Sequence, residues 1–186
     1  EFLLFSVFHD IVSYLGSNDS LSGILNISME FQSTAYRLFL ERELYDINGS
    51  NKFLIFAAAG AGSTWGNLSP FAVPQSLAFY QEDIINVAGL NCDQIGGTAS
   101  SHENMPQVHA VAKGCGIFEF SNDVESGSSY ASPVVATTIW LRQLLLHGAG
   151  KLAVDRNDVA RASRPPYVGP KLSSISAGGV FKPEAA

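Results

Sequence analysis

The residues best suited to chemistry lie in the segment 127–133, Gly-Ser-Ser-Tyr-Ala-Ser-Pro. Its glycine and small residues are typical of a tight entry into a helix, which we expect over residues 129–147. The hydroxyl of Ser129 would then lie at a helix N-terminus, where free N–H groups and the helix dipole stabilise a developing negative charge. Such a serine can act as a nucleophile, and its own N–H can contact an oxyanion. The alternative is a simple cap, the common role of a serine at the start of a helix.

The long helix that this serine begins carries two further expectations. Pro133 should be tolerated, because the first amides of a helix have no acceptor in any case. The buried stripe of the helix is predicted at Val134, Thr138, Leu141 and Leu145, which recur every three or four residues.

The elements that must position the serine are helices with apolar stripes and strands that are almost wholly apolar. Continuous apolar strands are typical of a parallel sheet with both faces covered. Their alternation with helices predicts an α/β fold, with a mainly parallel buried sheet and helices on both faces. The predicted elements are helices at 2–15, 34–47, 129–147 and 157–163 and strands at 24–28, 52–59, 84–88, 108–112 and 116–120.

Ligands of parallel sheets bind at the carboxyl ends of the strands. Two such ends are suggestive here, Ser28 and the turn 60–62, Gly-Ala-Gly. Small residues at these ends allow another backbone to approach closely.

Residues 127–136, Gly-Ser-Ser-Tyr-Ala-Ser-Pro-Val-Val-Ala, resemble the nucleophile motif of the subtilisin-like serine proteases, Gly-Thr-Ser-Met-Ala-Ser-Pro-His-Val-Ala. Residues 25–29, Leu-Asn-Ile-Ser-Met, resemble the cleft strand of that family, Ile-Asn-Met-Ser-Leu. Residues 56–62, Phe-Ala-Ala-Ala-Gly-Ala-Gly, resemble the family's turn Val-Ala-Ala-Ala-Gly-Asn-Glu-Gly. The resemblance runs from about residue 24 to 186 and implies the family's fold. Its blocks, in the family's order, are 25–29, 56–62, 84–89, 108–114, 127–136 and 178–186.

The resemblance also implies roles for individual residues. Ser129 matches the nucleophile. Two short segments match the walls of the pocket for the side chain before the scissile bond, and both pair with substrate backbone as strands. These substrate-binding residues are Ser28, Met29 and Glu30 on one wall and Ala58, Ala59 and Gly60 on the other.

The acid and the base of the family's triad have no counterpart in the sequence. Both should precede the cleft strand at Ile24, in Asp-Ser/Thr-Gly and His-Gly-Thr-His-Val-Ala-Gly motifs, and neither motif occurs. We therefore expect residues 1–186 to be one domain segment, the C-terminal part of a peptidase domain that lacks its N-terminal portion. The missing half, in the same polypeptide or as a separate chain, would supply the Asp and the His.

None of the four histidines matches the family's base. His9 and Asp10 are predicted to form a solvated pair on a helix. His102 is predicted in a surface loop and His109 in a strand, as packing or at its edge. His147 ends the long helix, where a partly cationic ring suits the dipole.

Ala61 stands where the family has the asparagine of its oxyanion hole. Loss of such a donor lowers turnover by about 10²–10³, while the N–H of Ser129 would remain. The alanine is either a natural or an engineered replacement, and Asn67 is an alternative donor. Glu30 and Phe31 replace small glycines after the cleft serine, so that either the cleft prefers a basic residue near Glu30 or Glu30 faces water.

Composition excludes several kinds of partner. The net charge is −6 and the 11 Lys and Arg form no cluster, so we expect no binding to nucleic acid or acidic membrane surfaces. The longest small or apolar run, 53–62, is too short for the roughly 20 residues of a membrane span. Only 15% of residues are charged, against about 25% in typical domains. A buried sheet and a surface covered by the missing half would explain this shortage.

No residues predict a metal or a cofactor. Two cysteines are too few for a zinc site or a disulfide scaffold, and they form either one disulfide or two buried thiols. Asn-X-Ser sequons give a slight indication of secretion, although one of them falls in a predicted buried strand. The residues concerned are Cys92 and Cys115, and Asn18, Asn26, Asn48 and Asn67.

Two functions remain in competition. The first is a serine endopeptidase that cleaves peptide or protein substrates through an acyl-enzyme on Ser129. The second is an impaired pseudoprotease that binds a peptide or a protein partner through the inherited cleft, as Ala61 and Glu30 suggest.

Overall fold

The computed structural model describes residues 2–29, 34–48, 52–58, 74–79, 81, 83–90, 109–114, 127–147 and 159. Helices and strands alternate along these segments from α1 to β3, as the apolar patterns predict, and β4 follows β3 with no described helix between them. The elements are α1 (Phe2–Ser17), β1 (Gly23–Ile27), α2 (Thr34–Asn48), β2 (Phe53–Ala58), the short 3₁₀ helix η1 (Gln75–Phe79), β3 (Ile84–Leu90), β4 (Ala110–Lys113) and α3 (Ser128–His147).

The four strands form a parallel sheet in the order β1-β2-β3-β4. Every residue of β2 is buried, because this strand has a neighbour on each side and helices above and below. β1 lies at one edge of the sheet and is only partly buried. A parallel sheet needs such cover on both faces, which is why its strands are continuous apolar runs.

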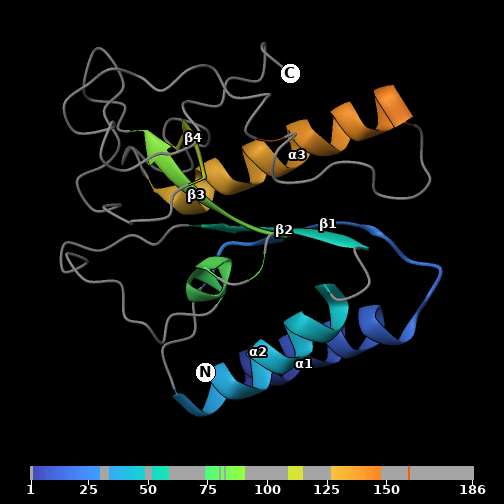
Figure 1. Ribbon diagram of the computed structural model, residues 1–186. Coiled ribbons are helices and arrows are strands. Elements are labelled where there is room, and N and C mark those ends of the chain that lie inside the picture. Colours follow the sequence, from blue (N-terminus) through green and yellow to red (C-terminus); the bar gives the residue numbers. More distant parts are fainter. Residues whose placement is uncertain are drawn as a thin grey trace.

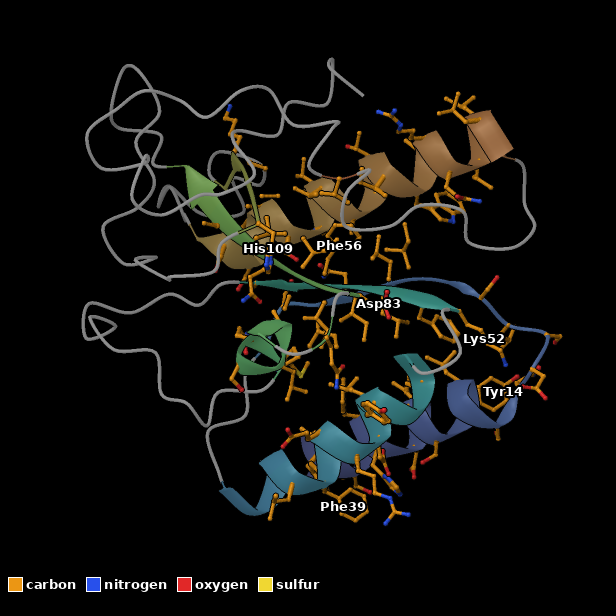
Figure 2. All side chains as sticks on the ribbon, in the orientation of Figure 1. Tyr14, Phe39, Lys52, Phe56, Asp83 and His109 are labelled. Carbon is orange, nitrogen blue, oxygen red and sulfur yellow. The ribbon has the colours of Figure 1, made fainter. Side chains whose placement is uncertain are left out.

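Helices cover the two faces of the sheet as separate layers, α3 on one side and α1, α2 and η1 on the other (Figure 1). Alternate residues of a strand point to opposite faces. In β2, Leu54 and Phe56 pack against α3, whereas Phe53, Ile55 and Ala57 face the other helices. Figure 2 shows Phe56 in the layer between the sheet and α3. The expected α/β fold with helices on both faces is therefore confirmed.

The buried stripe of α3 differs from the predicted one. Leu141 and Leu145 are exposed by 48% and 84%, so that part of the prediction is wrong. Apolar residues recur every three or four positions on several faces of α3, because this helix is apolar almost all round. The face that packs on the sheet is the one with the smallest of these residues. The side chains that α3 buries in the core are Ala131, Val135, Ala136 and Ile139.

In α2, Leu40, Leu44 and Ile47 recur at steps of four and three and are fully or almost fully buried. Each such side chain contributes about 1.5–3 kcal/mol of hydrophobic free energy. In α1, Val12 is buried, but Ile11 is 52% exposed.

His9 and Asp10 do not form the solvated pair that the sequence suggests. The Nδ1 atom of His9 lies 2.5 Å from Glu43 Oε1 on α2, and its ring packs on Phe5 and Phe39. Asp10 is exposed. Contact with α2 decides the position of His9, which one helix alone could not predict. His9 therefore joins α1 to α2, beneath the face of the sheet opposite α3.

Candidate active site

Ser28, Ala58 and Ser129 come together at one edge of the fold. In a parallel sheet all strands end at the same edge, where Ser28 follows β1 and Ala58 closes β2. Ser129 lies in the first turn of α3, and its carbonyl oxygen accepts a hydrogen bond of 3.2 Å from Ser28 Oγ. The described residues of the two expected pocket walls and the expected nucleophile thus belong to one site.

A tight contact between glycines positions the start of α3. The N–H of Gly127 donates to the carbonyl of Gly114 at 2.8 Å. A Cβ atom on Gly114 would lie 2.5 Å from the oxygen of Gly127 and 3.0 Å from the Cα of Gly89. The entry to the helix therefore rests directly on the backbone of β3 and β4. Sequence reasoning did not assign Gly89 or Gly114, although a glycine within a strand signals such an approach.

Pro133 costs α3 a hydrogen bond, contrary to our expectation. The helix begins at Ser128, and the amides of Tyr130 and Ala131 already donate to Gly127 O. Pro133 lies in the second turn, where its missing N–H leaves the carbonyl of Ser129 without its helical donor. The hydroxyl of Ser28 fills that place. A residue from the cleft strand thus completes the helix that carries Ser129.

Asn26 extends this connection between β1 and α3. Its Nδ2 donates to Ser28 Oγ at 2.9 Å, and its Oδ1 accepts from Ser132 Oγ at 2.7 Å. Both amide atoms are thereby used, which fixes the orientation of the side chain. Asn26 is exposed, so the expectation that it is buried is wrong. The reason is that β1 is the edge strand of the described sheet.

The hydroxyl of Ser129 is exposed and weakly held. Its Oγ lies 3.5 Å from the carbonyl oxygen of Ser28, the single hydrogen-bond partner that it has among the described residues. Its N–H is one of the first amides of α3, which lack acceptors within the helix. The positive end of the helix dipole favours negative charge at this point. The arrangement suits a nucleophile whose proton passes to a separate base.

Gln75 connects the two expected pocket walls through hydrogen bonds. Its side chain is almost wholly buried, with 1% exposed. Its Nε2 donates to Ala58 O at 2.7 Å and to Met29 O at 3.2 Å, one carbonyl from each wall. Sequence reasoning did not single out this residue, because a glutamine in a loop carries no distinctive signal.

Asn86 and His109 support Gln75 in turn. The side chain of Asn86, on β3, donates to Gln75 O at 3.0 Å. The backbone N–H of Asn86 donates to Nδ1 of His109, and the N–H of His109 donates to Asn86 O. Nδ1 is therefore an acceptor, and the ring is held just before β4 (Figure 2). His109 joins two strands and does not contact Ser129 Oγ.

Several predicted residues lie outside the described residues or side chains. They are Glu30, Phe31, Ala59, Gly60, Ala61, Asn67, Cys92, His102, Cys115 and the side chain of His147, together with the strand at 116–120 and, apart from Val159, the helix at 157–163.

Within the described segments, no three His, Cys, Asp or Glu side chains gather as metal ligands. No described helix has both the length and the apolar character that crossing a membrane requires.

Comparison with known proteins gives structural matches alone. No family model matches the sequence, and no curated protein matches it. A cold-adapted subtilisin-like serine proteinase matches with a TM-score of 0.60 and 16% identity, over 95% of this chain and 60% of that one.

Two further solved structures match equally well. The serine protease MycP1, described as an essential component of the type VII (ESX-1) secretion system, has a TM-score of 0.63 and 15% identity, over 97% of this chain and 56% of its own. A lanthipeptide protease has a TM-score of 0.63 and 14% identity, over 95% and 65%. The chain thus spans about 60% of the length of its neighbours. At these identities the likeness shows the fold, and the fold is that of subtilisin-like serine proteases.

Proposed function

We propose that the complete protein is a serine endopeptidase and that Ser129 is its nucleophile. The observation that carries the proposal is the place of Ser129, an exposed hydroxyl in the first turn of α3, joined to the end of β1 by Ser28 and Asn26. Ser28 and Met29 on one side, and Ala58 on the other, would bind the peptide on either side of its reacting residue. The neighbours with this fold are serine proteases.

The reaction would run through an acyl-enzyme. Ser129 Oγ attacks the carbonyl carbon of the scissile bond while its proton passes to a histidine base, and the N–H of Ser129 stabilises the oxyanion. The tetrahedral intermediate collapses, the C–N bond breaks, and the histidine gives the proton to the leaving amine. Water then attacks the ester in the same way, which releases the acid and restores the hydroxyl.

The histidine and its acid would come from a segment outside residues 1–186. Neither described histidine side chain can act as the base. His9 lies between α1 and α2, on the side of the sheet opposite α3 and Ser129. His109 accepts the N–H of Asn86 at Nδ1, so the other nitrogen of its neutral ring carries a proton and cannot accept one from Ser129. The edge of β1 offers a place for that segment. Ile24, Asn26, Ala136, Thr137 and Trp140 line a hollow of about 320 Å³ there.

A fluorophosphonate probe tests the proposal, because it phosphonylates only an activated serine. We expect the complete protein, with its Asp and His, to be labelled, and Ser129→Ala to abolish labelling. Ser13→Ala, which removes an exposed serine of α1, is the matched control and should label normally. Absence of labelling at Ser129, even after Ala61→Asn supplies the family's oxyanion donor, would sink the proposal.

A pseudoprotease is the second candidate, and Ala61 is the observation that favours it. In that case the cleft binds peptide, but Ser129 remains unlabelled and no product forms. Cleavage that disappears in Ser129→Ala would decide against it.

A further inference from the structure

Gln75 carries an unused hydrogen-bond acceptor at the base of the proposed cleft. Its Oε1 is buried and has no hydrogen-bond partner among the described residues. The amide cannot be turned round to remove this feature, because Oε1 would then face the carbonyl oxygens of Ala58 and Met29. The Nε2 group of the amide therefore donates to the two walls, and Oε1 remains as a free acceptor.

Unpaired buried oxygens continue beside Gln75. Asn86 Oδ1 and Ser76 Oγ also lack partners, and both residues are at least 95% buried. Native proteins contain few such atoms, and each asks for an explanation such as an unseen partner. Ser76 follows Gln75 in η1 and Asn86 bonds to the backbone of Gln75, and a partner for Gln75 Oε1 has to bring an N–H or O–H group.

We propose that Gln75 forms the base of the pocket for the side chain before the scissile bond and selects a long side chain that ends in N–H donors, lysine or arginine. The inference rests on the proposed cleft, since it is the resemblance that makes Met29 and Ala58 its walls. Gln75 bonds to one carbonyl of each wall and is almost wholly buried, so a side chain that bonds to its oxygen would have to be long. The net charge of −6 also favours a cation.

We expect the pocket to discriminate between side chains that donate a hydrogen bond to Gln75 Oε1 and apolar side chains that do not. An apolar side chain of the same length would fill the pocket but leave Oε1 unpaired, and sites built for a hydrogen bond reject ligands that lack it. We expect a lysine peptide to bind about tenfold more tightly than its norleucine counterpart, which corresponds to one good hydrogen bond to a charged donor.

The experiment measures fluorescence anisotropy of labelled peptides that differ only in the selected residue, which is lysine, arginine, glutamine or norleucine. The complete protein carries Ser129→Ala to prevent turnover. Gln75→Met removes both functions of the amide and should bring the lysine-to-norleucine ratio close to one. Gln143→Met changes another buried glutamine, on α3, and should leave the ratio unchanged.

Each outcome bears on the proposal. Equal affinities in the unaltered cleft, or no binding of any peptide, overturn it without reference to the variants. A lysine preference that persists in folded Gln75→Met also overturns it, because charge elsewhere is then the cause. A glutamine peptide that matches lysine overturns the selection of a cation, because an uncharged N–H donor is then sufficient.

The variant Gln75→Met loses hydrogen bonds to both walls and has to be checked by thermal melting. If it unfolds, the four peptides in the unaltered cleft decide alone, and a lysine-to-norleucine affinity ratio close to one contradicts the proposal. Failure of the proposed function is separately visible. If lysine peptides are selected but Ser129 is not labelled, Gln75 selects peptides in a pseudoprotease. If Ser129 is labelled but no peptide is selected, the role of Gln75 is refuted and the endopeptidase proposal stands.

Discussion

Ser28 acts on Ser129 through the backbone of α3. Pro133 removes the amide that would normally bind the carbonyl of Ser129, and the Ser28 hydroxyl takes its place at 3.2 Å. Asn26 holds that hydroxyl in turn. The position of the candidate nucleophile is therefore determined by residues that lie about a hundred positions earlier in the chain.

Ser28→Ala tests this connection. We expect the free energy of unfolding to fall by about 1–2 kcal/mol, because the carbonyl of Ser129 loses its donor, and labelling of Ser129 to slow. Ser28→Thr keeps the hydroxyl and should retain most of both. Urea denaturation and probe kinetics measure the two effects.

Ser17→Ala serves as the control for this prediction. It also removes a bond from a hydroxyl to a backbone carbonyl, that of Tyr14 at 3.0 Å, but at an exposed helix end. Its effect should stay within about 0.5 kcal/mol. An equal loss of unfolding free energy in both variants would show that the bond to the Ser129 carbonyl contributes no more to stability than an exposed one.

At the scale of elements, the contact of α3 with β3 and β4 depends on the absence of side chains at Gly89 and Gly114. These strands and the turn at Gly127 meet backbone to backbone. The contact places the start of the helix, and hence Ser129, at the carboxyl edge of the sheet.

Gly114→Ala should be strongly destabilising. Its Cβ would lie 2.5 Å from Gly127 O, and overpacking of this kind typically costs about 1–3 kcal/mol. Gly23→Ala, on β1, meets nothing within 4 Å and should change stability by less than about 0.5 kcal/mol. Thermal or urea unfolding of the two variants gives the comparison, and similar values for both would refute this account of the turn.

A second prediction at this scale concerns the link between Lys52, before β2, and Asp19, before β1. The hydrogen bond and the charge of Lys52 hold the pKa of Asp19 below its usual 3.8. The unfolded chain then binds this proton more readily than the folded one, so the link stabilises the fold above pH 3.8 and is lost as the pH falls through the lowered pKa.

Lys52→Met should therefore reduce the acid dependence of stability between pH 5 and pH 2, by a small amount since Asp19 is fully exposed. Urea unfolding across that interval measures it. An unchanged slope in the variant would show that other carboxyl groups cause the whole acid dependence.

At the scale of the whole molecule, the described helices expose many large hydrophobic side chains. Large hydrophobic side chains are exposed on all three long helices, including Leu3, Val7, Ile11 and Tyr14 along α1. Phe39 lies on the side of the two helices away from the sheet, and Tyr14 lies at the end of α1 (Figure 2). Extended apolar surface of this kind marks sites of interaction, which agrees with the proposal that a further segment covers part of this chain.

Residues 1–186 alone should accordingly self-associate as their concentration rises. The variant Val7→Lys with Ile11→Lys replaces two half-exposed side chains of α1 and should shift the chain toward monomer. Ser13→Lys with Ser17→Lys adds the same charge at exposed polar positions and should not. Light scattering coupled to size exclusion measures the masses, and a monodisperse, cooperatively folding monomer of the unaltered chain would contradict the prediction.

The sequence by itself determined the class of fold and the position of Ser129 at the start of a helix. Continuous apolar strands alternate with helices, and that pattern requires a covered parallel sheet, because the apolar residues of β2 can be buried only between two layers. The order of the motifs along the chain also carried the resemblance to subtilisin-like proteases, and the structural neighbours confirm the fold.

Tertiary structure alone decided which face of α3 is buried, that Asn26 is exposed, and that Ser28 completes the helix at Ser129. It also revealed the bonds of Gln75 to Ala58 and Met29 and the place of His9 beside Glu43. Each of these depends on which element packs beside which, at sequence separations of up to about a hundred residues, and local periodicity contains no information on such contacts. Propensity specifies an element, but its neighbours decide what each side chain touches.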